Sequence, residues 1–161
     1  LGVKMARPER EVVVMVGDCS YLMLNSELAT SVALGCKLIV VLLDNRGFGC
    51  INRLQRACGG EPYGNLLGDA TSPMAPTVDF AAHARALGAT AEHVRDLGEL
   101  RAALDRARAA VHTAVVVIDT DPPRSTAAGG EWWNVPVAEV SGSDTVRAAH
   151  REYLHQLGER T

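Results

Sequence analysis

The sequence predicts an α/β protein in which a mainly parallel sheet lies between two layers of helices. Short, continuously apolar segments rich in β-branched residues alternate with longer segments of helical pattern. This alternation is typical of a parallel sheet whose two faces are both covered. The chain has 161 residues, 47% of them hydrophobic, which is enough for the core of one domain. We therefore expect a single three-layer α/β/α domain over residues 1–161.

The elements follow from these patterns in chain order. Apolar runs of strand length predict strands at Glu11–Val16, Lys37–Leu43, Ala91–Val94 (the weakest of the four) and Thr113–Ile118. Helical patterns, ended by Gly35 and Gly88 in the first two cases, predict helices at Ser20–Leu34, Asp79–Leu87, Leu97–Ala110 and Ser143–Leu157. The segment Arg46–Val78 is rich in Gly and Pro and is interpreted as a long loop, and loops of that length are usually functional.

Composition excludes several classes of protein. The 16 Lys and Arg against 19 Asp and Glu give a net charge of -3, and no basic stripe suggests nucleic-acid binding. The apolar runs are much shorter than the ~20 residues of a membrane-spanning helix, so we expect no membrane partner. The four cysteines form no CxxC pair and no secretory signal pattern opens the chain, which indicates the reducing cytoplasm.

Polar residues follow two of the predicted strands. Asp18 comes directly after Val16-Gly17, and Asn45 follows Leu43-Asp44. The carboxyl ends of parallel strands meet at one edge of a sheet, where ligands of such folds bind. Gly17 permits a tight turn and a close backbone approach, and the helix expected next offers free N–H groups to an anion such as a phosphate.

A carboxylate at Asp18 would repel a phosphate unless a cation lies between them. Mg²⁺ is commonly shared between carboxylates and substrate phosphates. We therefore expect Mg²⁺ at the Asp18 carboxylate, the Asn45 amide oxygen and the Gly47 carbonyl, with the Ser20 hydroxyl and nearby N–H groups on a diphosphate. The alternative is that Asp18 merely caps a helix and Asn45 merely forms a turn, which are common roles.

The motif Gly17-Asp18-Cys19-Ser20, with Asn45 one helix and one strand later, resembles the signature of thiamine-diphosphate-dependent enzymes of the acetolactate synthase-like group. The resemblance implies thiamine diphosphate and Mg²⁺ as cofactors, with the metal on Asp18, Asn45 and Gly47. It implies cofactor contacts from Gly17, Asp18, Cys19, Ser20, Asn45, Gly47, Phe48 and Gly49. Cys19 departs from the Gly usual at that position, where Ala also occurs in relatives. A small side chain is therefore expected to be tolerated there, whereas a bulky one would crowd the diphosphate.

Longer runs narrow the resemblance. Three segments resemble the sequences of hydrolases of inositol catabolism, which open a cyclic 1,2-diketone to 5-deoxy-glucuronate. These segments are YLMLNSE, DNRGFGCINRLQ and the pair Trp132-Trp133. This implies a homo-oligomer with the cofactor at the subunit interface and an activating Glu in an N-terminal domain. No residue here matches that Glu, so we expect no catalytic residue in this chain and no activity from it alone.

We then expect residues 1–161 to be a fragment that contains the C-terminal domain. The sequence begins without an initiator Met, and its first residues resemble the end of a helix. The fragment would lack the family's first strand and its N-terminal domains. Two alternatives remain open. The chain could belong to another thiamine-diphosphate enzyme, of the acetolactate synthase or decarboxylase type, or it could be a binding module without catalysis.

Other candidates favour structural roles. The histidines show no metal-ligand spacing and are expected at the surface or in the core. Cys50 is expected to be a small buried hydrophobe. Arg53 and Arg56 are expected to meet solvent or a subunit, and Trp132-Trp133 to anchor the end of the chain rather than line a pocket.

Overall fold

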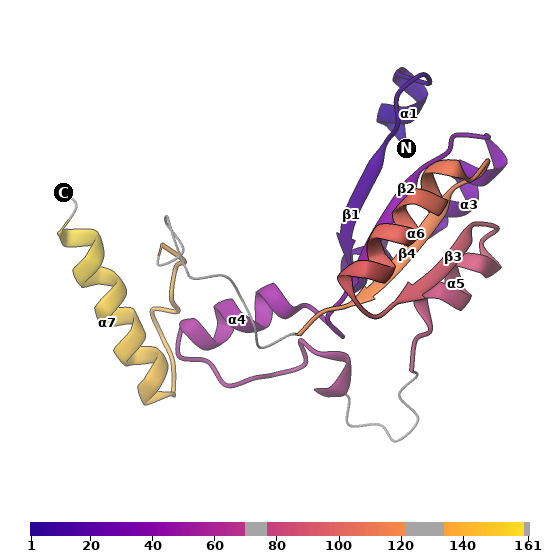
Figure 1. The fold of residues 1–161 in the computed structure, drawn as a ribbon. Coiled ribbons are helices and arrows are strands. Elements are labelled where there is room, and N and C mark those ends of the chain that lie inside the picture. The colour runs from indigo at the N-terminus through magenta and orange to yellow at the C-terminus, as the bar shows by residue number, and fades with distance from the viewer. Residues whose placement is uncertain (70–76, 122–133, 160–161) are drawn as a thin grey trace. The chain divides into compact units, whose positions relative to one another are not determined.

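A computed structural model describes residues 1–69, 77–121 and 134–159 (Figure 1). These residues form two compact units. The first unit comprises residues 1–47 and 77–121, and the second comprises residues 48–69 and 134–159. The sheet and every helix that packs on it belong to the first unit.

The first unit is built on a four-stranded, entirely parallel sheet with strand order β1-β2-β4-β3. The strands are β1 (Val13–Gly17), β2 (Ile39–Asp44), β3 (Thr90–Val94) and β4 (Ala114–Asp119). Each lies within two residues of its predicted bounds, and the weakest predicted strand is the edge strand β3. The register pairs Gly17 with Leu43 and Asp44 with Asp119. The carboxyl ends of β1, β2 and β4 therefore lie at one edge of the sheet.

Helices cover both faces of this sheet, which confirms the predicted three-layer α/β/α class. One layer consists of α2 (Asp18–Met23), α3 (Ser26–Ala33) and α5 (Phe80–Ala86), and the other is α6 (Leu97–Ala109). Tyr21, Leu28 and Phe80 from the first layer pack with Leu42 and Val117 of the sheet. From α6, the small residues Ala103 and Ala107 pack with Ile39, Ala114 and Val116 on the opposite face. The short helix α1 (Gly2–Ala6) precedes β1.

The single helix predicted over Ser20–Leu34 is wrong, because the chain breaks between α2 and α3. The Asn25 side chain donates a hydrogen bond from Nδ2 to the Leu22 carbonyl at 2.8 Å. The Leu24 N–H donates to the Tyr21 carbonyl at 3.2 Å, a contact three residues back rather than four. An Asn side chain that takes a backbone carbonyl competes with the helical ladder, so α2 ends at Met23.

The expectation that all strands are covered on both faces is wrong for β1. Val13 is 50% exposed and Met15 is 72% exposed, although both lie in an unbroken apolar run. Their register partners Ile39 and Val41 on β2 are buried. The helix on this side, α6, packs on β2, β3 and β4, so this face of β1 stays open while Val12, Val14 and Val16 join the core on the other face.

The second unit contains α4 (Gly49–Ala57), a 3₁₀ turn at Leu67–Asp69 and α7 (Asp144–Gly158). The predicted long loop therefore holds a nine-residue helix, since all its Pro residues and all its Gly residues except Gly47 and Gly49 lie after that helix. Gly59 follows α4 with φ +80°, and a Cβ there would lie 2.5 Å from the Thr145 carbonyl oxygen. The Thr145 hydroxyl donates to the Gly59 carbonyl at 2.7 Å, which joins α4 to α7.

Three minor predictions fall in or near this unit. Cys50 is exposed, so its predicted burial is wrong. Arg53 and Arg56 are exposed, in keeping with a solvent or subunit contact. Trp132-Trp133 lies outside the described residues. Within the described ranges, none of the helices has both the length and the apolar character that crossing a bilayer requires.

Candidate functional site

Asp18 lies at the carboxyl end of β1 and is fully buried, with 0% exposure. Its Oδ1 accepts a hydrogen bond from the Cys19 N–H at 2.7 Å, and its Oδ2 accepts one from the Gly47 N–H at 2.8 Å. The helix cap is Gly17, and Asp18 is the first helical residue. The interpretation of Asp18 as a mere cap is therefore wrong, because its side chain joins β1 to the segment that follows β2.

Asn45 follows β2 and carries an unpaired acceptor. Its amide oxygen Oδ1 is buried and has no hydrogen-bond partner among the described residues. Leaving such a buried acceptor unpaired costs about 1–3 kcal/mol. A side chain that only forms a turn has no reason to carry that cost, so the free oxygen favours a ligand for it, either a donor or a cation.

The backbone after β2 takes an unusual path. Arg46 has φ +58°, the only positive φ of a non-glycine residue in the described part of the chain, and Gly47 has φ +150°. Asp44 stabilises this turn, because its Oδ1 accepts the Arg46 N–H at 2.9 Å and its Oδ2 lies 3.0 Å from Nη2 of Arg46. Sequence reasoning missed Asp44 as a site residue. In the sequence, Asp44 is only an acidic residue directly before Asn45, which does not show that it is buried.

Two buried carboxyl groups thus share this edge of the sheet. Burial raises the pKa of Asp44, the Arg46 N–H opposes that rise, and the neighbouring Asp18 carboxyl adds to it. Two adjacent carboxyls in a buried setting attract a cation. Burial, and then the charges of Asp18 and Asp44, also raise the pKa of the Cys19 thiol, so Cys19 is a neutral, buried side chain.

Gly17 has φ -76°, an ordinary extended value, so the passage from β1 into α2 does not use the conformational freedom of glycine. A Cβ placed on Gly17 would meet open space within the chain. The space beside the strand end is therefore free for something other than this chain. Ser20 lies one turn along and is exposed, so its hydroxyl is accessible to a ligand.

Phe48 and Gly49 belong to the second unit. Phe48 precedes α4 as its cap residue, and its N–H donates to the Asn65 carbonyl at 2.7 Å. Gly49 is buried and is the first residue of α4, so it lies in a helix rather than in the predicted loop. Their contact with a cofactor stays a prediction.

Several histidines have partners away from this site. His83 Nδ1 lies 2.9 Å from the Tyr21 hydroxyl, and burial raises the pKa of Tyr21 to about 12. His93 Nε2 lies 3.0 Å from Asp119 Oδ1. Across the described ranges, no three His, Cys, Asp or Glu side chains gather as a metal cluster.

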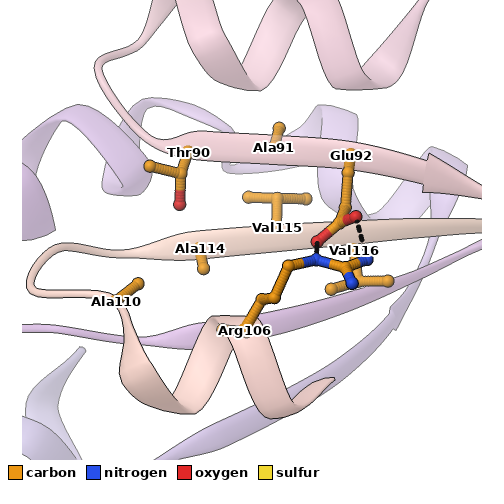
Figure 2. Close-up of a pocket in the computed structure, with 9 residues that line it drawn as sticks. Thr90, Ala91, Glu92, Arg106, Ala110, Ala114, Val115 and Val116 are labelled. Atoms are coloured by element: carbon orange, nitrogen blue, oxygen red, sulfur yellow. Dashed lines mark hydrogen bonds and ion pairs between the residues drawn. The ribbon is translucent and has the colours of Figure 1, made fainter. Parts of the chain in front are cut away.

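A pocket of about 260 Å³ lies at the amino ends of β3 and β4 (Figure 2). Its apolar lining includes Ala91, Ala114 and Val115, and an ion pair between Arg106 and Glu92 lies beside it. The pocket is at the opposite end of the strands from Asp18 and Asn45. It offers small apolar side chains and one satisfied ion pair, so it forms no part of the candidate site.

The oxygens at the carboxyl edge fit a hard divalent cation. A carboxylate offers about four lone-pair sites, and Asp18 uses two of them for backbone N–H groups. Asn45 adds an amide oxygen that has no hydrogen-bond partner among the described residues. The N–H of Gly47 is held by Asp18, and the Gly47 carbonyl as a third ligand stays a prediction. Carboxylate, amide and carbonyl oxygens are the ligands that Mg²⁺ and Ca²⁺ accept.

The fold and this site define a cofactor-binding domain, and comparison with known proteins agrees. The model of the family described as "Thiamine pyrophosphate enzyme, C-terminal TPP binding domain" matches residues 1–120. The chain belongs to this family. The predicted cofactor, thiamine diphosphate, is thereby confirmed at the level of the family.

The curated relatives are more particular. The chain is 41% identical to 3D-(3,5/4)-trihydroxycyclohexane-1,2-dione hydrolase of Geobacillus thermodenitrificans, over 97% of this chain and 25% of the relative. It is 40% identical to 3D-(3,5/4)-trihydroxycyclohexane-1,2-dione hydrolase 1 of Bacillus cereus, over 98% and 25%. The chain therefore spans about a quarter of the length of these relatives, and the predicted narrower resemblance is confirmed.

A solved structure supports the fold. The Rhodococcus jostii thiamine diphosphate-dependent 4-hydroxybenzoylformate decarboxylase superposes with a TM-score of 0.61 at 20% identity, over 74% of this chain and 21% of that one. At this identity the likeness establishes the fold alone.

Proposed function

We propose that this chain is the cofactor-binding part of a thiamine-diphosphate-dependent hydrolase that opens the ring of 3D-(3,5/4)-trihydroxycyclohexane-1,2-dione, giving 5-deoxy-glucuronate in myo-inositol catabolism. Identity of about 40% over nearly the whole chain supports this substrate. The observation in the fold that carries the proposal is the contact between Asp18 and Gly47, beside an Asn45 oxygen without a partner.

The site is proposed to hold the diphosphate end of the cofactor through Mg²⁺. Asp18, Asn45 and the Gly47 carbonyl are the metal ligands, and Ser20 with the N–H groups of the first turn of α2 contacts phosphate oxygens. Gly17 leaves room for the diphosphate, because a side chain there would occupy the open space at the strand end. Cys19, Phe48 and Gly49 complete the proposed contacts.

When bound, thiamine diphosphate supplies an electron sink for cleavage of a carbon–carbon bond next to a carbonyl. The residues of this chain bind and orient the diphosphate, and none of them is proposed to exchange a proton with the substrate. The activating Glu is proposed to come from an N-terminal domain of a partner subunit, in a homo-oligomer with the cofactor at the interface. The four cysteines are free thiols, which supports a cytoplasmic location.

Calorimetric titration of thiamine diphosphate at varied Mg²⁺ tests the site. Binding is expected to require the metal. Replacing a residue that only supports a metal ligand costs about 10- to 100-fold in affinity, so Asp18→Ala is expected to cost more than about 100-fold. Asp119→Ala removes an exposed carboxylate at the end of β4, on the far side of β2 from Asp18, and is the matched control. Metal-independent binding, or equal losses in both variants, would overturn the proposed site.

The substrate is tested on the longer protein, because the relatives are about four times as long as this chain. With Mg²⁺ and thiamine diphosphate, the longer protein is expected to turn over the cyclic dione and not pyruvate or an aromatic 2-oxo acid. The isolated chain is expected to be inactive with all of them. Turnover of a 2-oxo acid in preference to the dione would assign a synthase or decarboxylase instead.

A further inference from the structure

Two aspartates end neighbouring strands in matched positions but very different surroundings. Asp44 ends β2 and Asp119 ends β4, and the two are register partners. Asp44 is only 2% exposed, whereas the Asp119 side chain is 59% exposed and pairs with His93. Burying a carboxylate costs free energy unless it is paired or binds a cation, so the burial of Asp44 needs a reason that Asp119 does not share.

Beside the Asp18 carboxyl, Asp44 contacts the backbone and side chain of the turn that follows it. Its Oδ1 accepts the Arg46 N–H at 2.9 Å, and its Oδ2 lies 3.0 Å from Nη2 of Arg46. Its backbone carbonyl accepts the Thr120 N–H at 2.8 Å, which attaches the same point to β4. Nη1 of Arg46 donates in turn to the Val78 carbonyl at 3.2 Å. The turn is thus attached to β4 and to the segment before α5.

These contacts stabilise a conformation that Arg46 would otherwise avoid. The left-handed region at φ +58° costs an L-residue about 1–2 kcal/mol. Such strain persists only where surrounding contacts hold it, and it concentrates at ligand sites. The residues on either side of Arg46 are Asn45, with the unpaired oxygen, and Gly47, with its N–H on Asp18. The direction of both proposed ligands therefore depends on the conformation that Asp44 and Arg46 maintain.

We propose that Asp44 is a positioning residue, which acts through its ion pair with Arg46 to fix the geometry of the metal ligands Asn45 and Gly47 and thereby makes the site selective for Mg²⁺. The proposal rests on the proposed function of the Asp18 site. Asp44 is not proposed as a ligand: its Oδ1 accepts the Arg46 N–H, and its Oδ2, which is buried and accepts no hydrogen bond within the described residues, has the Arg46 guanidinium at 3.0 Å as its ion-pair partner.

The choice of metal separates positioning from simple stabilisation. Mg²⁺ demands nearly ideal octahedral geometry, whereas Ca²⁺ accepts six to eight oxygens in flexible arrangements. A loosened turn should therefore weaken Mg²⁺-dependent binding more than Ca²⁺-dependent binding. A loss of folded protein lowers both apparent affinities by the same factor, so the ratio of the two is unchanged by stability alone.

The test measures calorimetric affinity for thiamine diphosphate with saturating Mg²⁺ and, separately, with saturating Ca²⁺. In Asp44→Asn the Oδ1 acceptor remains and the ion pair is lost. We expect about a 10-fold loss with Mg²⁺, the lower end for residues that support metal ligands, and no more than about two-fold with Ca²⁺. Asp119→Asn is the same substitution at the register partner, and it should leave both affinities within about two-fold.

Each other outcome overturns the proposal in a recognisable way. Equal losses with both metals in Asp44→Asn would make Asp44 a direct ligand or a stability residue, and no loss would make its burial incidental. If Asp18→Ala binds as well as the unsubstituted protein, the proposed site itself fails. If the unsubstituted protein shows no metal-dependent binding, both proposals fail together.

Discussion

The strands β1 and β2 are alike in sequence and differ in burial. Both are continuous apolar runs, and each leads to part of the candidate site: β1 ends at Gly17, directly before Asp18, and β2 ends at Asp44, directly before Asn45. β2 lies between β1 and β4, and five of its six residues are buried. β1 lies at the edge of the sheet, with Met15 72% exposed.

The difference shows what an apolar pattern can and cannot establish. The pattern selects a strand, because β-branched apolar residues fit a pleated, packed surface. Burial of both faces of a strand depends on its neighbours in the sheet and on whether a helix covers it. In the described sheet, α6 packs mainly on β2, β3 and β4. The site is unaffected, because parallel register alone brings the two strand ends to one edge.

The largest change in the free energy of unfolding is expected for a substitution in the buried strand β2, compared with one in the exposed face of β1. Leu42 on β2 has 0% exposure, so Leu42→Ala should leave a cavity and lower the free energy of unfolding by about 2–5 kcal/mol. Met15→Ala on β1 should change it by about 0.5 kcal/mol or less. Chemical denaturation of both variants measures the contrast. Similar losses would mean that β1 is covered after all.

A smaller effect concerns the turn that follows β2. Arg46→Ala and Arg46→Gly both remove the ion pair with Asp44, but only glycine takes φ +58° without steric cost. The glycine variant should therefore be more stable than the alanine variant by about 1 kcal/mol. Urea unfolding of the two variants without metal provides the measurement. An alanine variant of equal or greater stability would show that the turn is not held in the left-handed region.

A third effect concerns two carboxyl groups whose contributions to stability should depend on pH in opposite ways. Asp44 lies at the end of β2, and Asp79 caps α5. The raised pKa of Asp44 means that its contribution to stability is present below the ordinary value of 3.8 and is lost as pH rises through the raised value. The Ala82 N–H lowers the pKa of Asp79, so its contribution is present above 3.8 and is lost as pH falls.

The free energy of unfolding of the unsubstituted protein, relative to each Asp→Asn variant, should therefore change in opposite directions with pH. Relative to Asp44→Asn it should fall as pH rises above 3.8, and relative to Asp79→Asn it should fall as pH drops below 3.8. Slopes of the same sign would contradict the assigned environments. The measurement is made without Mg²⁺, because a bound cation would favour the ionised form of the carboxyls near it.

Much of the fold was predictable from local pattern, and the position of the candidate site at the strand ends from two short motifs. The four strands and the placement of Asp18 and Asn45 depend on residue type and on parallel register, which the sequence carries directly. The break at Asn25 depends on one side-chain hydrogen bond to Leu22. The helix α4 was hidden because Gly and Pro elsewhere in the segment dominated its composition.

The role of Asp44 was out of reach for a different reason. An acidic residue at a strand end has the same appearance in sequence whether it is buried, as Asp44 is, or exposed, as Asp119 is. Only the structure shows that Arg46 takes a left-handed conformation and pairs with it. Strained backbone and the pairing of neighbouring side chains are properties of geometry, and no residue spacing predicts them.

Asp18, Asn45 and Gly47 together are proposed to hold the metal of a bound diphosphate. The most direct measurement is an experimental structure of the protein with Mg²⁺ and thiamine diphosphate. We predict a metal ion at about 2.0–2.1 Å from an Asp18 carboxylate oxygen, the Asn45 amide oxygen and the Gly47 carbonyl oxygen, with Asp44 still paired to Arg46. A metal bound elsewhere, or a diphosphate bound without these three oxygens, would contradict the account.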